Sequence, residues 1–434
     1  MTLFSDDKPQ SFPIPSSRFS RMVNLGSMAT GIAGNIFLSA TQQFTMGQKT
    51  NFKDLVLSQS NMLRFVKHLS QMRGAAMKVG QLLSLEVGEF ISPQVSEVLS
   101  LLRNQAYAMP PDQLNSVLKK NWGPNFNERF EKFDRQPIAA ASIGQVHRCI
   151  TKNGTPLAIK VQYPGIRDSI ESDIKNLKFL LKTIGLIPPL IDFDSLMEAG
   201  KNQLYLETDY LAEAEFLESF SRLVANLEVF EVPRVYPPLS TSNILAMEFK
   251  EGITLDKAST LTQRQRNNLI YNIMKLLFAE IFDFKLIQTD PNFSNFLYHE
   301  KRDKIVLLDF GATQKITPNL SKKFRTLLRA TWRNDEVDIK TALTDLNILH
   351  PSFPSHFEEI FMEIFLDATK PIREKKTFDF REIRIIEKIQ NHAQEIISYQ
   401  KKIKVPDMAT LLIQRKVGGL FFMAKHLSAS IDLN

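Results

Sequence analysis

Cysteine is nearly absent from this chain, with Cys149 as the single example among 434 residues. No disulfide can form within the chain, and this favours a reducing compartment. Cys149 falls in a predicted strand, where a small core residue is more common than a reactive thiol. The seven histidines show no metal-ligand spacing. The sequence therefore predicts neither thiol chemistry nor a metal bound by histidines.

Acidic residues are fewer than basic ones, which leaves a net charge of +7 and a pI of about 9.2. A basic protein favours anionic partners, such as nucleic acid, phosphates or a membrane surface. No RNP, zinc-finger or helix-turn-helix pattern occurs, and the basic residues are spread along the chain. The sequence therefore predicts an anionic membrane surface as a partner, rather than nucleic acid.

Charge is missing altogether from residues 22–48. The preceding residues 1–17 are rich in proline and serine, and we expect them to be disordered. The apolar stretch 22–40 approaches the length of a membrane span, although its asparagines weaken that interpretation. A transmembrane or re-entrant helix, an interfacial helix with flanking arginines at the headgroups, and a packed helix all remain open. The layout is not that of a secretory signal.

Two short segments carry the strongest chemical signal, QTDPNFSNFL (288–297) and IVLLDFGAT (305–313). The first is a polar loop with Asp290 and Asn295 five residues apart, and in the second an apolar predicted strand ends at Asp309. This order is that of protein kinases, in which the loop Asp orients the nucleophile and the other two supply oxygen ligands for Mg²⁺. Asp-Phe-Gly alone is weak evidence for a kinase-like site, because Asp and Gly are common at turns.

An upstream strand and helix strengthen this interpretation. The segment TPLAIKVQYP (155–164) alternates as a half-buried strand does, and its Lys160 fits the strand lysine that reaches the α- and β-phosphates. Such a lysine needs an acidic partner on a helix, and residues 196–223 are predicted to form one helix. Its acidic residues include Glu207, Asp209 and Glu213. An acidic helix face is usually just solvated, so the expectation that Glu207 pairs with Lys160 rests on the ensemble of motifs and not on this helix alone.

An alanine-rich segment, PIAAASIGQVHRC (137–149), stands where an ordinary kinase has its glycine-rich loop. Its loop residues are Ala139, Ala140, Ala141 and Ser142. Alanine restricts the backbone more than glycine does. A short linker explains the pattern, and so does a stiffer turn that covers the nucleotide with Ser142 near the phosphates.

Two further segments carry candidate residues. Apolar spacing over 51–87 predicts a helix, near whose end Lys78 and Gln81 share one face. From the residues alone, these are two exposed polar side chains beside a glycine. The segment NILAMEF (243–249) predicts a strand that leads into a hinge, where Glu248 and Phe249 would offer backbone groups to adenine. A plain core strand explains the same pattern.

Together these motifs resemble the UbiB/AarF family of atypical kinases. They follow the family order: Lys-x-Gly-Gln, the alanine-rich loop ending in SIGQVH, A-I-K, E-x-D, TDPNxSN and DFG. The match spans residues 78–311, and helical flanks extend it to nearly the whole chain. QTDPNFSN and the N-terminal SSRFSRMVNLGSMATG (16–31) are similar to the coenzyme Q-linked branch. Gln-Thr stands where ordinary kinases have His-Arg before the catalytic Asp, which puts conventional regulation through that Arg in doubt.

The resemblance implies an α+β, two-lobed protein-kinase-like fold with an N-terminal helical extension. The expected parts are a disordered tail at 1–17, the extension at 18–125, an N-lobe at 126–250 and a C-lobe at 251–434. The extension would contain the Lys-x-Gly-Gln motif and the apolar stretch.

The resemblance also implies the role of each motif residue, with ATP and Mg²⁺ as cofactors. Lys160 and Glu207 would form the ion pair that bridges the lobes. Asp290 would take the catalytic-loop position, and Asn295 and Asp309 would bind the metal.

The motifs that depart from ordinary kinases would limit substrate access. Lys78 and Gln81 would reach into the active site and occupy the space of a protein substrate. Residues 139–142 would replace the glycine-rich loop and bias nucleotide use.

The implied function is ATP hydrolysis that supports ubiquinone biosynthesis, acting on or extracting lipid precursors at a membrane. The protein would act at the cytoplasmic face of a bacterial inner membrane or at the matrix face of a mitochondrial membrane. Partners would include ubiquinone-pathway lipid precursors and other ubiquinone biosynthesis proteins, and a homodimer stays open. Two rival functions remain, a true protein kinase and a non-catalytic, nucleotide-gated lipid-binding scaffold.

Overall fold

The computed structural model describes most of the chain from residue 108 onward. The described residues are 2–3, 74–75, 78, 108–141, 143–184, 193–350, 353–374, 377–382, 384, 387–388, 391–392 and 407–432. Gln81, Ser142 and the apolar stretch 22–40 lie outside them. The chain divides into two compact units, a first unit of Met1–Glu215 with Arg234–Phe249 and a second unit of Phe216–Pro233 with Lys250–Asn434.

The first unit is built on a six-stranded sheet with the order β1-β3-β4-β5-β7, and β2 pairs with β4. Its strands are β1 (Thr2–Leu3), β2 (Phe130–Phe133), β3 (Ala139–Ala140), β4 (Gly144–Thr151), β5 (Pro156–Gln162) and β7 (Ile244–Glu248). β5 lies between β4 and β7, and all its residues after Pro156 are buried. Lys160 pairs with Val146 on one side and with Leu245 on the other, so its backbone is fixed by both neighbouring strands.

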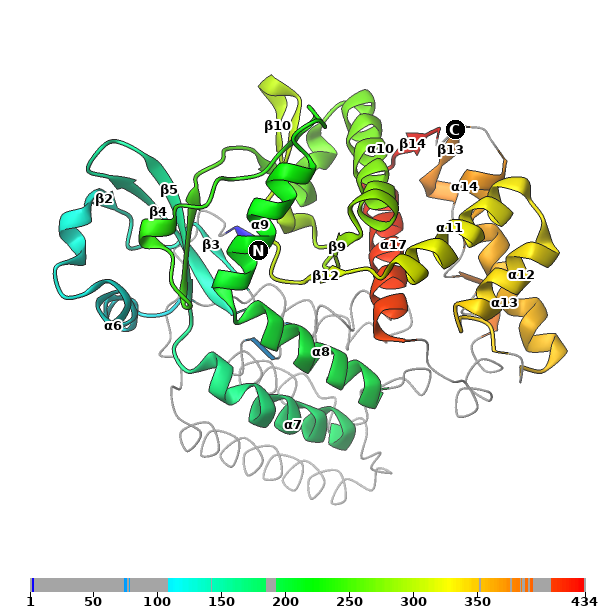
Figure 1. The fold of residues 1–434 in the computed structure, drawn as a ribbon, viewed down its shortest axis with the longest axis horizontal. Helices are drawn as coiled ribbons and strands as arrows, with labels where there is room; N and C mark the ends of the chain where they lie inside the picture. Colours follow the sequence, from blue (N-terminus) through cyan, green and yellow to red (C-terminus); the bar gives the residue numbers. More distant parts are fainter. Residues whose placement is uncertain are drawn as a thin grey trace, which may run out of the picture. The chain divides into compact units, whose positions relative to one another are not determined.

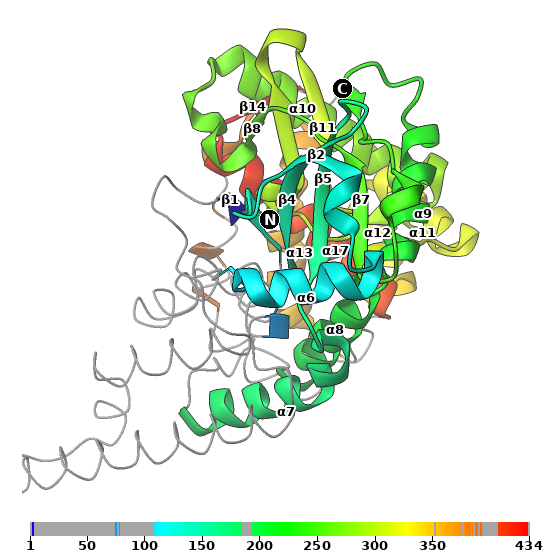
Figure 2. The same cartoon turned by 90° about the vertical axis from the view of Figure 1, so that its left-hand side faces the viewer.

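Helix α6 (Pro111–Trp122) crosses strands of this sheet, as Figure 2 shows. A proline occupies its first position, where no N–H is needed, and Gly123 ends it with a φ of 87°. Leu114, Leu118 and Trp122 recur every four residues and are buried. The Trp122 indole N–H donates to the Leu239 carbonyl at 2.9 Å, which links α6 to the segment before β7.

Three more helices lie between β5 and β7 in the sequence. They are α7 (Ile166–Ile184), α8 (Phe193–Glu207) and α9 (Tyr210–Leu223). The prediction of a single helix over 196–223 is wrong, because the helix is interrupted at residues 208–209. The Thr208 hydroxyl donates to the Tyr205 carbonyl at 2.7 Å, and Asp209 Oδ1 accepts the Ala212 backbone N–H at 3.1 Å. Asp209 therefore acts as the N-terminal cap of a new helix.

The second unit contains a four-stranded sheet and a separate strand pair. The sheet order is β6-β11-β10-β8, and β9 pairs with β12. These strands are β6 (Phe230–Glu231), β8 (Ile253–Thr254), β9 (Leu286–Gln288), β10 (Phe296–His299), β11 (Lys304–Leu307) and β12 (Thr313–Lys315). The predicted strand before Asp309 is confirmed as β11. Leu307 is opposite Phe296 and Thr313 is opposite Gln288, which brings residues 288–295 beside residues 308–313.

Helices make up the rest of the second unit. They are α10 (Gln263–Ala279), α11 (Pro318–Arg333), α12 (Glu336–Asp345), α13 (Ser355–Ala368), α14 (Lys370–Arg373) and α17 (Met408–His426). α10 and α17 lie side by side (Figure 1), and the short strands β13 (Phe378–Asp379) and β14 (Ser430–Ile431) pair beyond α17. Among the described helices, none combines the length and the apolar composition that a bilayer crossing requires.

Candidate active site

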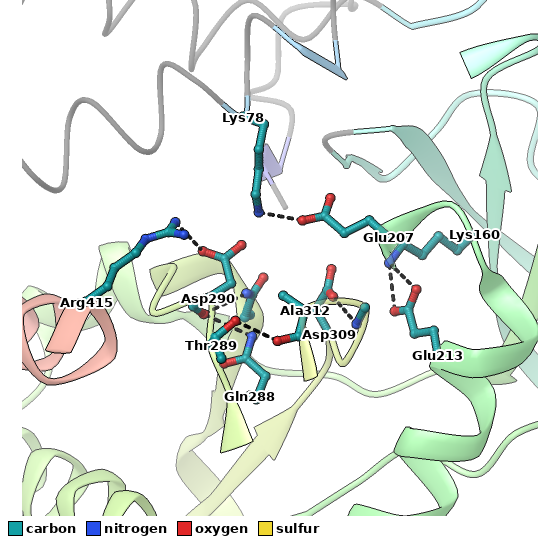
Figure 3. Close-up of polar contacts among 12 residues, drawn as sticks. Lys78, Lys160, Glu207, Glu213, Gln288, Thr289, Asp290, Asp309, Ala312 and Arg415 are labelled. Carbon is teal, nitrogen blue, oxygen red and sulfur yellow. Dashed lines mark hydrogen bonds and ion pairs between the residues drawn. The ribbon is translucent and has the colours of Figure 1, made fainter. Parts of the chain in front are cut away.

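Lys160 forms a buried ion pair with Glu213 of α9 in the first unit (Figure 3). The Lys160 Nζ lies 2.8 and 2.9 Å from the two carboxylate oxygens of Glu213. It also lies 5.2 Å from the centre of the Tyr210 ring, where a cation is favoured. The prediction that Glu207 would pair with Lys160 is therefore wrong. The physical reason is the helix break at 208–209, which starts a second helix and gives Glu213 the position facing β5.

Glu207 instead pairs with Lys78, whose Nζ lies 2.5 Å from the Glu207 carboxylate. Lys78 is completely buried, so the expectation of an exposed side chain from residues alone is wrong. A buried lysine needs such a partner, because burial without one costs several kcal/mol. The two acidic residues of the predicted helix thus serve two different lysines, and each pair is enclosed within the first unit.

The alanine-rich segment is a strand and not a linker. Ala139 and Ala140 form β3 and are fully buried, and the Ala141 N–H donates to the Gly144 carbonyl at 2.8 Å. A Cβ added to Gly144 would lie 2.8 Å from the Tyr210 hydroxyl oxygen and closer still to the Val161 carbonyl oxygen. Glycine is therefore required at the start of β4, where this strand pairs with the end of β5.

A buried network on β4 gave no signal in the sequence. Gln145 Oε1 accepts the Met109 N–H at 2.7 Å, and Gln145 Nε2 lies 2.8 Å from Nε2 of His147. The other ring nitrogen, Nδ1, lies 2.8 Å from the Asp134 carbonyl oxygen, which can only accept. The ring therefore carries its proton on Nδ1, and Nε2 accepts from Gln145. Burial lowers the pKa of His147 to about 4, so the ring is neutral near pH 7.

The predicted strand over 243–249 is confirmed as β7, which ends at Glu248 and is followed by Phe249. The Glu248 N–H donates to the Arg234 carbonyl at 2.8 Å, and the Phe249 N–H donates to the Pro156 carbonyl at 3.2 Å. The Arg148 guanidinium lies 4.5 Å from the centre of the Phe249 ring. The N–H groups of Glu248 and Phe249, two of the backbone groups that we expected to face adenine, are thus bonded within the protein.

The loop after β9 places Asp290 beside the Asp-Phe-Gly segment in the second unit (Figure 3). The Thr289 N–H and hydroxyl both donate to the Ala312 carbonyl, at 3.0 and 2.7 Å. Gln288 Nε2 donates to the Asp290 carbonyl at 3.0 Å. These bonds fix the backbone on both sides of the Asp290 carboxylate. Gln288 and Thr289, which replace the usual His-Arg, therefore have a structural role in the loop.

Asn295 and Asp309 meet in the same unit through the hairpin of β10 and β11. The Leu308 N–H donates to the Asn295 carbonyl at 2.9 Å. Asp309 is the next residue after Leu308, so this bond brings the backbone that carries Asp309 beside Asn295. Asn295 Nδ2 donates to the Asp290 carbonyl at 3.1 Å, so the amide oxygen points the other way. Asp309 Oδ1 accepts the Gly311 N–H at 3.0 Å. An amide oxygen and a carboxylate are hard oxygen ligands, and this donor set fits Mg²⁺.

Phe310 fixes the segment that carries Asp309. Its ring is buried and packs on Phe220 of α9 with 4.7 Å between ring centres. Phe220 also contacts Phe284 edge to face at 6.4 Å. Because Phe220 is itself buried, its ring holds Phe310 in place within the second unit.

These features define a protein-kinase-like protein: a strand lysine paired with a helical glutamate, and a loop Asp and Asn beside a strand that ends in Asp-Phe-Gly. The fold agrees with that class. The structure of the Mycobacterium tuberculosis protein Rv3197 in complex with erythromycin is similar, with a TM-score of 0.56 at 22% identity, covering 86% of this chain and 93% of that one. Together with the atypical kinase-like domain that matches residues 101–343, this likeness confirms the predicted α+β, protein-kinase-like fold class.

The family follows from sequence comparison. The ABC1 atypical kinase-like domain matches residues 101–343. The mitochondrial atypical kinase COQ8 of Saccharomyces cerevisiae is 34% identical over 427 residues, which cover 98% of this chain and 85% of that protein. The COQ8 protein of Schizosaccharomyces pombe is 34% identical over 422 residues, which cover 96% and 68%. The chain belongs to the ABC1, or UbiB/COQ8, family of atypical kinases, which confirms the resemblance.

Proposed function

We propose that the chain is a Mg²⁺-dependent ATPase of the kinase-like type. The observation that carries this proposal is the arrangement of the second unit, in which two strand pairs bring Asp290, Asn295 and Asp309 together. The buried Lys160 of the first unit supports it, because its ammonium group is suited to phosphate oxygens. Mg²⁺, when bound, supplies positive charge that offsets the phosphate oxygens during transfer.

Each residue then has a definite task in the reaction. Lys160 would bind phosphate oxygens of ATP, while Glu213 keeps its side chain extended and charged. Asp290 would orient the attacking water through its carboxylate and accept a proton from it. Asn295 and Asp309 would present their oxygens to the metal. The backbone bonds of Thr289 and Gly311 hold these groups before substrate arrives, which is the main source of catalytic gain in phosphoryl transfer.

The biological role that we propose is support of ubiquinone biosynthesis through lipid precursors at a membrane. The similarity to mitochondrial COQ8 proteins over nearly the whole chain supports this role and a mitochondrial location. The net charge of +7 supports contact with an anionic membrane surface. Ubiquinone-pathway proteins would be the partners.

The test of this role is rescue of a Saccharomyces cerevisiae strain that lacks its COQ8 protein. The chain would be expressed with a mitochondrial leader, beside Asp290→Asn and Asp309→Asn variants at equal protein levels. We expect the original chain to restore ubiquinone, measured by chromatography of lipid extracts, and both variants to fail. Equal rescue by the variants would contradict catalysis and favour a nucleotide-gated scaffold. Failure of all three chains would count against the ubiquinone role.

A further inference from the structure

Helix α17 lies outside residues 101–343, which the family domain matches, yet it packs against the catalytic loop within the second unit. Asp407 caps its start, with Oδ1 accepting the Thr410 N–H at 2.8 Å. Its buried positions form one face of the helix. They are Thr410, Leu412, Ile413, Lys416, Gly419, Leu420, Met423 and Ala424. Lys416 and Gly419 are unusual on this buried face, because apolar side chains ordinarily occupy such positions. Their contacts explain their presence.

Lys416 fixes α17 to the turn that leads into the catalytic loop. Its Nζ lies 2.6 Å from Oε2 of Glu280, and both side chains are almost completely buried. Glu280 Oε1 also accepts the Gln288 backbone N–H at 3.4 Å, at the end of β9. Burial raises the pKa of Glu280, and the Lys416 cation opposes that rise. Because either charge alone would be buried without compensation, the pair holds the helix in one position.

Gly419 lets the helix backbone approach Pro291, the residue after Asp290. A Cβ on Gly419 would lie 2.6 Å from Cβ of Pro291 and closer still to its Cγ. Real Cβ atoms essentially never come so near another heavy atom. Among the residues that the structure describes, no atom lies within 4 Å of a Cβ added to the neighbouring Gly418. Only Gly419 is therefore needed for the contact.

Arg415 lies on the same helix and points toward the Asp290 carboxylate (Figure 3). Its Nη2 lies 3.7 Å from Asp290 Oδ1, and the two side chains are 5% and 12% exposed. At this distance, and this far from water, the guanidinium attracts the carboxylate and restricts its rotation.

The far end of α17 is also held in place. Gln263 of α10 donates from Nε2 to the Ser428 carbonyl at 2.8 Å, and the Ser430 N–H donates to Asn267 Oδ1 at 2.9 Å. Strand β14 then pairs with β13. The helix is therefore held near its middle by Lys416 and just beyond its C-terminal end, so its contacts with Asp290 and Pro291 are set by the fold.

We propose that α17 is a positioning element for the catalytic loop, in which Gly419 sets the distance of the loop and Arg415 orients the Asp290 carboxylate. Arg415 is a positioning residue, because it acts through Asp290. The activity readouts rest on the proposed ATPase function. A displaced Asp290 would slow the chemical step and leave nucleotide binding almost unchanged, since ATP is bound by other groups.

The first test compares Gly419→Ala with Gly418→Ala in steady-state phosphate release from Mg-ATP. We expect Gly419→Ala to lower kcat by about tenfold to a hundredfold with KM within about twofold, because small displacements at a reacting centre have effects of this size. Gly418→Ala is the matched control and should keep both values. A Gly419→Ala protein with the original kcat would overturn the role of Gly419.

The second test uses Arg415→Lys and Arg415→Met, with Lys425→Met as a control cation on the same helix. We expect Arg415→Met to lose at least tenfold in kcat with little change in KM, and Arg415→Lys to recover a substantial part. Lys425→Met should be unaffected. If Arg415→Lys and Arg415→Met lose activity equally and in proportion to lost thermal stability, the role is structural and the proposal is wrong.

A third measurement does not depend on turnover. Urea unfolding of Arg415→Met, Asp290→Asn and the double variant gives a double-mutant cycle. We expect non-additivity of roughly tenfold in the unfolding equilibrium constant, as for other contacting pairs. Additive effects would overturn the Arg415–Asp290 contact. An original chain without turnover but with a non-additive cycle would contradict the ATPase proposal while supporting the contact.

Discussion

Acidification should destabilise the first unit through His147. The ring is buried and neutral, and burial lowers its pKa to about 4 from an ordinary value of 6.5. Between these values the unfolded chain binds a proton that the folded chain does not, so stability falls as pH drops through 6.5. The loss is complete below pH 4. Above pH 6.5 the group has no effect on the pH dependence.

The size of this effect follows from the shift. At 1.36 kcal/mol per pKa unit, the full difference corresponds to about 3 kcal/mol, and roughly 2 kcal/mol of it is already lost at pH 5. That is a large part of the 5–15 kcal/mol that typically stabilises a domain. The network of Gln145 and the Asp134 carbonyl cannot relieve the loss, because a proton on Nε2 would face the Gln145 amide nitrogen.

The assay is urea unfolding at pH 7.5, 6 and 5 for the original chain and for His147→Gln. Glutamine removes the proton-binding ring. Between pH 7.5 and pH 5, the free energy of unfolding should therefore fall by about 2 kcal/mol less in the variant than in the original chain. His356→Gln, at an exposed position, is the matched control and should keep the original pH dependence. Equal pH dependence in the original chain and His147→Gln would refute the reasoning.

Three further predictions concern other buried groups. Glu213→Gln should lower kcat at least tenfold and weaken Mg-ATP binding, because it removes the carboxylate that holds Lys160, and Glu207→Gln should leave the Lys160 pair intact; steady-state kinetics and nucleotide titration compare the two. Phe220→Ala should destabilise the protein by about 3–5 kcal/mol in urea unfolding, since its ring is fully buried. Cys149 should react with a thiol reagent only after unfolding, because burial raises its pKa to about 12; rapid colour development with the folded protein would contradict this.

In the second unit, local motifs singled out Asp290, Asn295 and Asp309, and the structure joins these segments through contacts of short range in the sequence. Asp290, Asn295 and Asp309 all lie within twenty residues of one another. The loop of Asp290 and Asn295 leads into β10, which pairs with β11, the strand before Asp309 that the apolar pattern predicts. Once β10 and β11 pair, the Asn295 carbonyl must meet the Leu308 N–H.

The ion pairs of Lys160 and Lys78 in the first unit show where sequence patterns fail. Lys160 lies on the predicted strand, but the choice between Glu207 and Glu213 depended on whether one helix or two covered residues 196–223. The capping preference of Asp209 was the available signal, since aspartate favours a helix start over a helix interior. The burial of Lys78 could not be foreseen, because its partner lies 129 residues away in sequence.

The contacts of α17 had no local signal at all. Lys416 and Glu280 are 136 residues apart, and each reads alone as an ordinary charge on a helix. From the sequence, Gly419 is only a residue of low helix propensity inside a helix. Its close approach to Pro291 in the structure explains why glycine stands there. Long-range polar contacts of this kind require the fold, because neither periodicity nor spacing records which surfaces meet.

The central claim is tested most directly by phosphate release from Mg-ATP with the purified chain, with and without vesicles of anionic phospholipid. An Asp309→Asn variant, which lacks one of the two expected metal ligands, is measured beside it. We predict turnover by the original chain that rises on the vesicles and is lost in Asp309→Asn. Absence of turnover under every condition while nucleotide still binds, or equal turnover by the variant, would contradict the account.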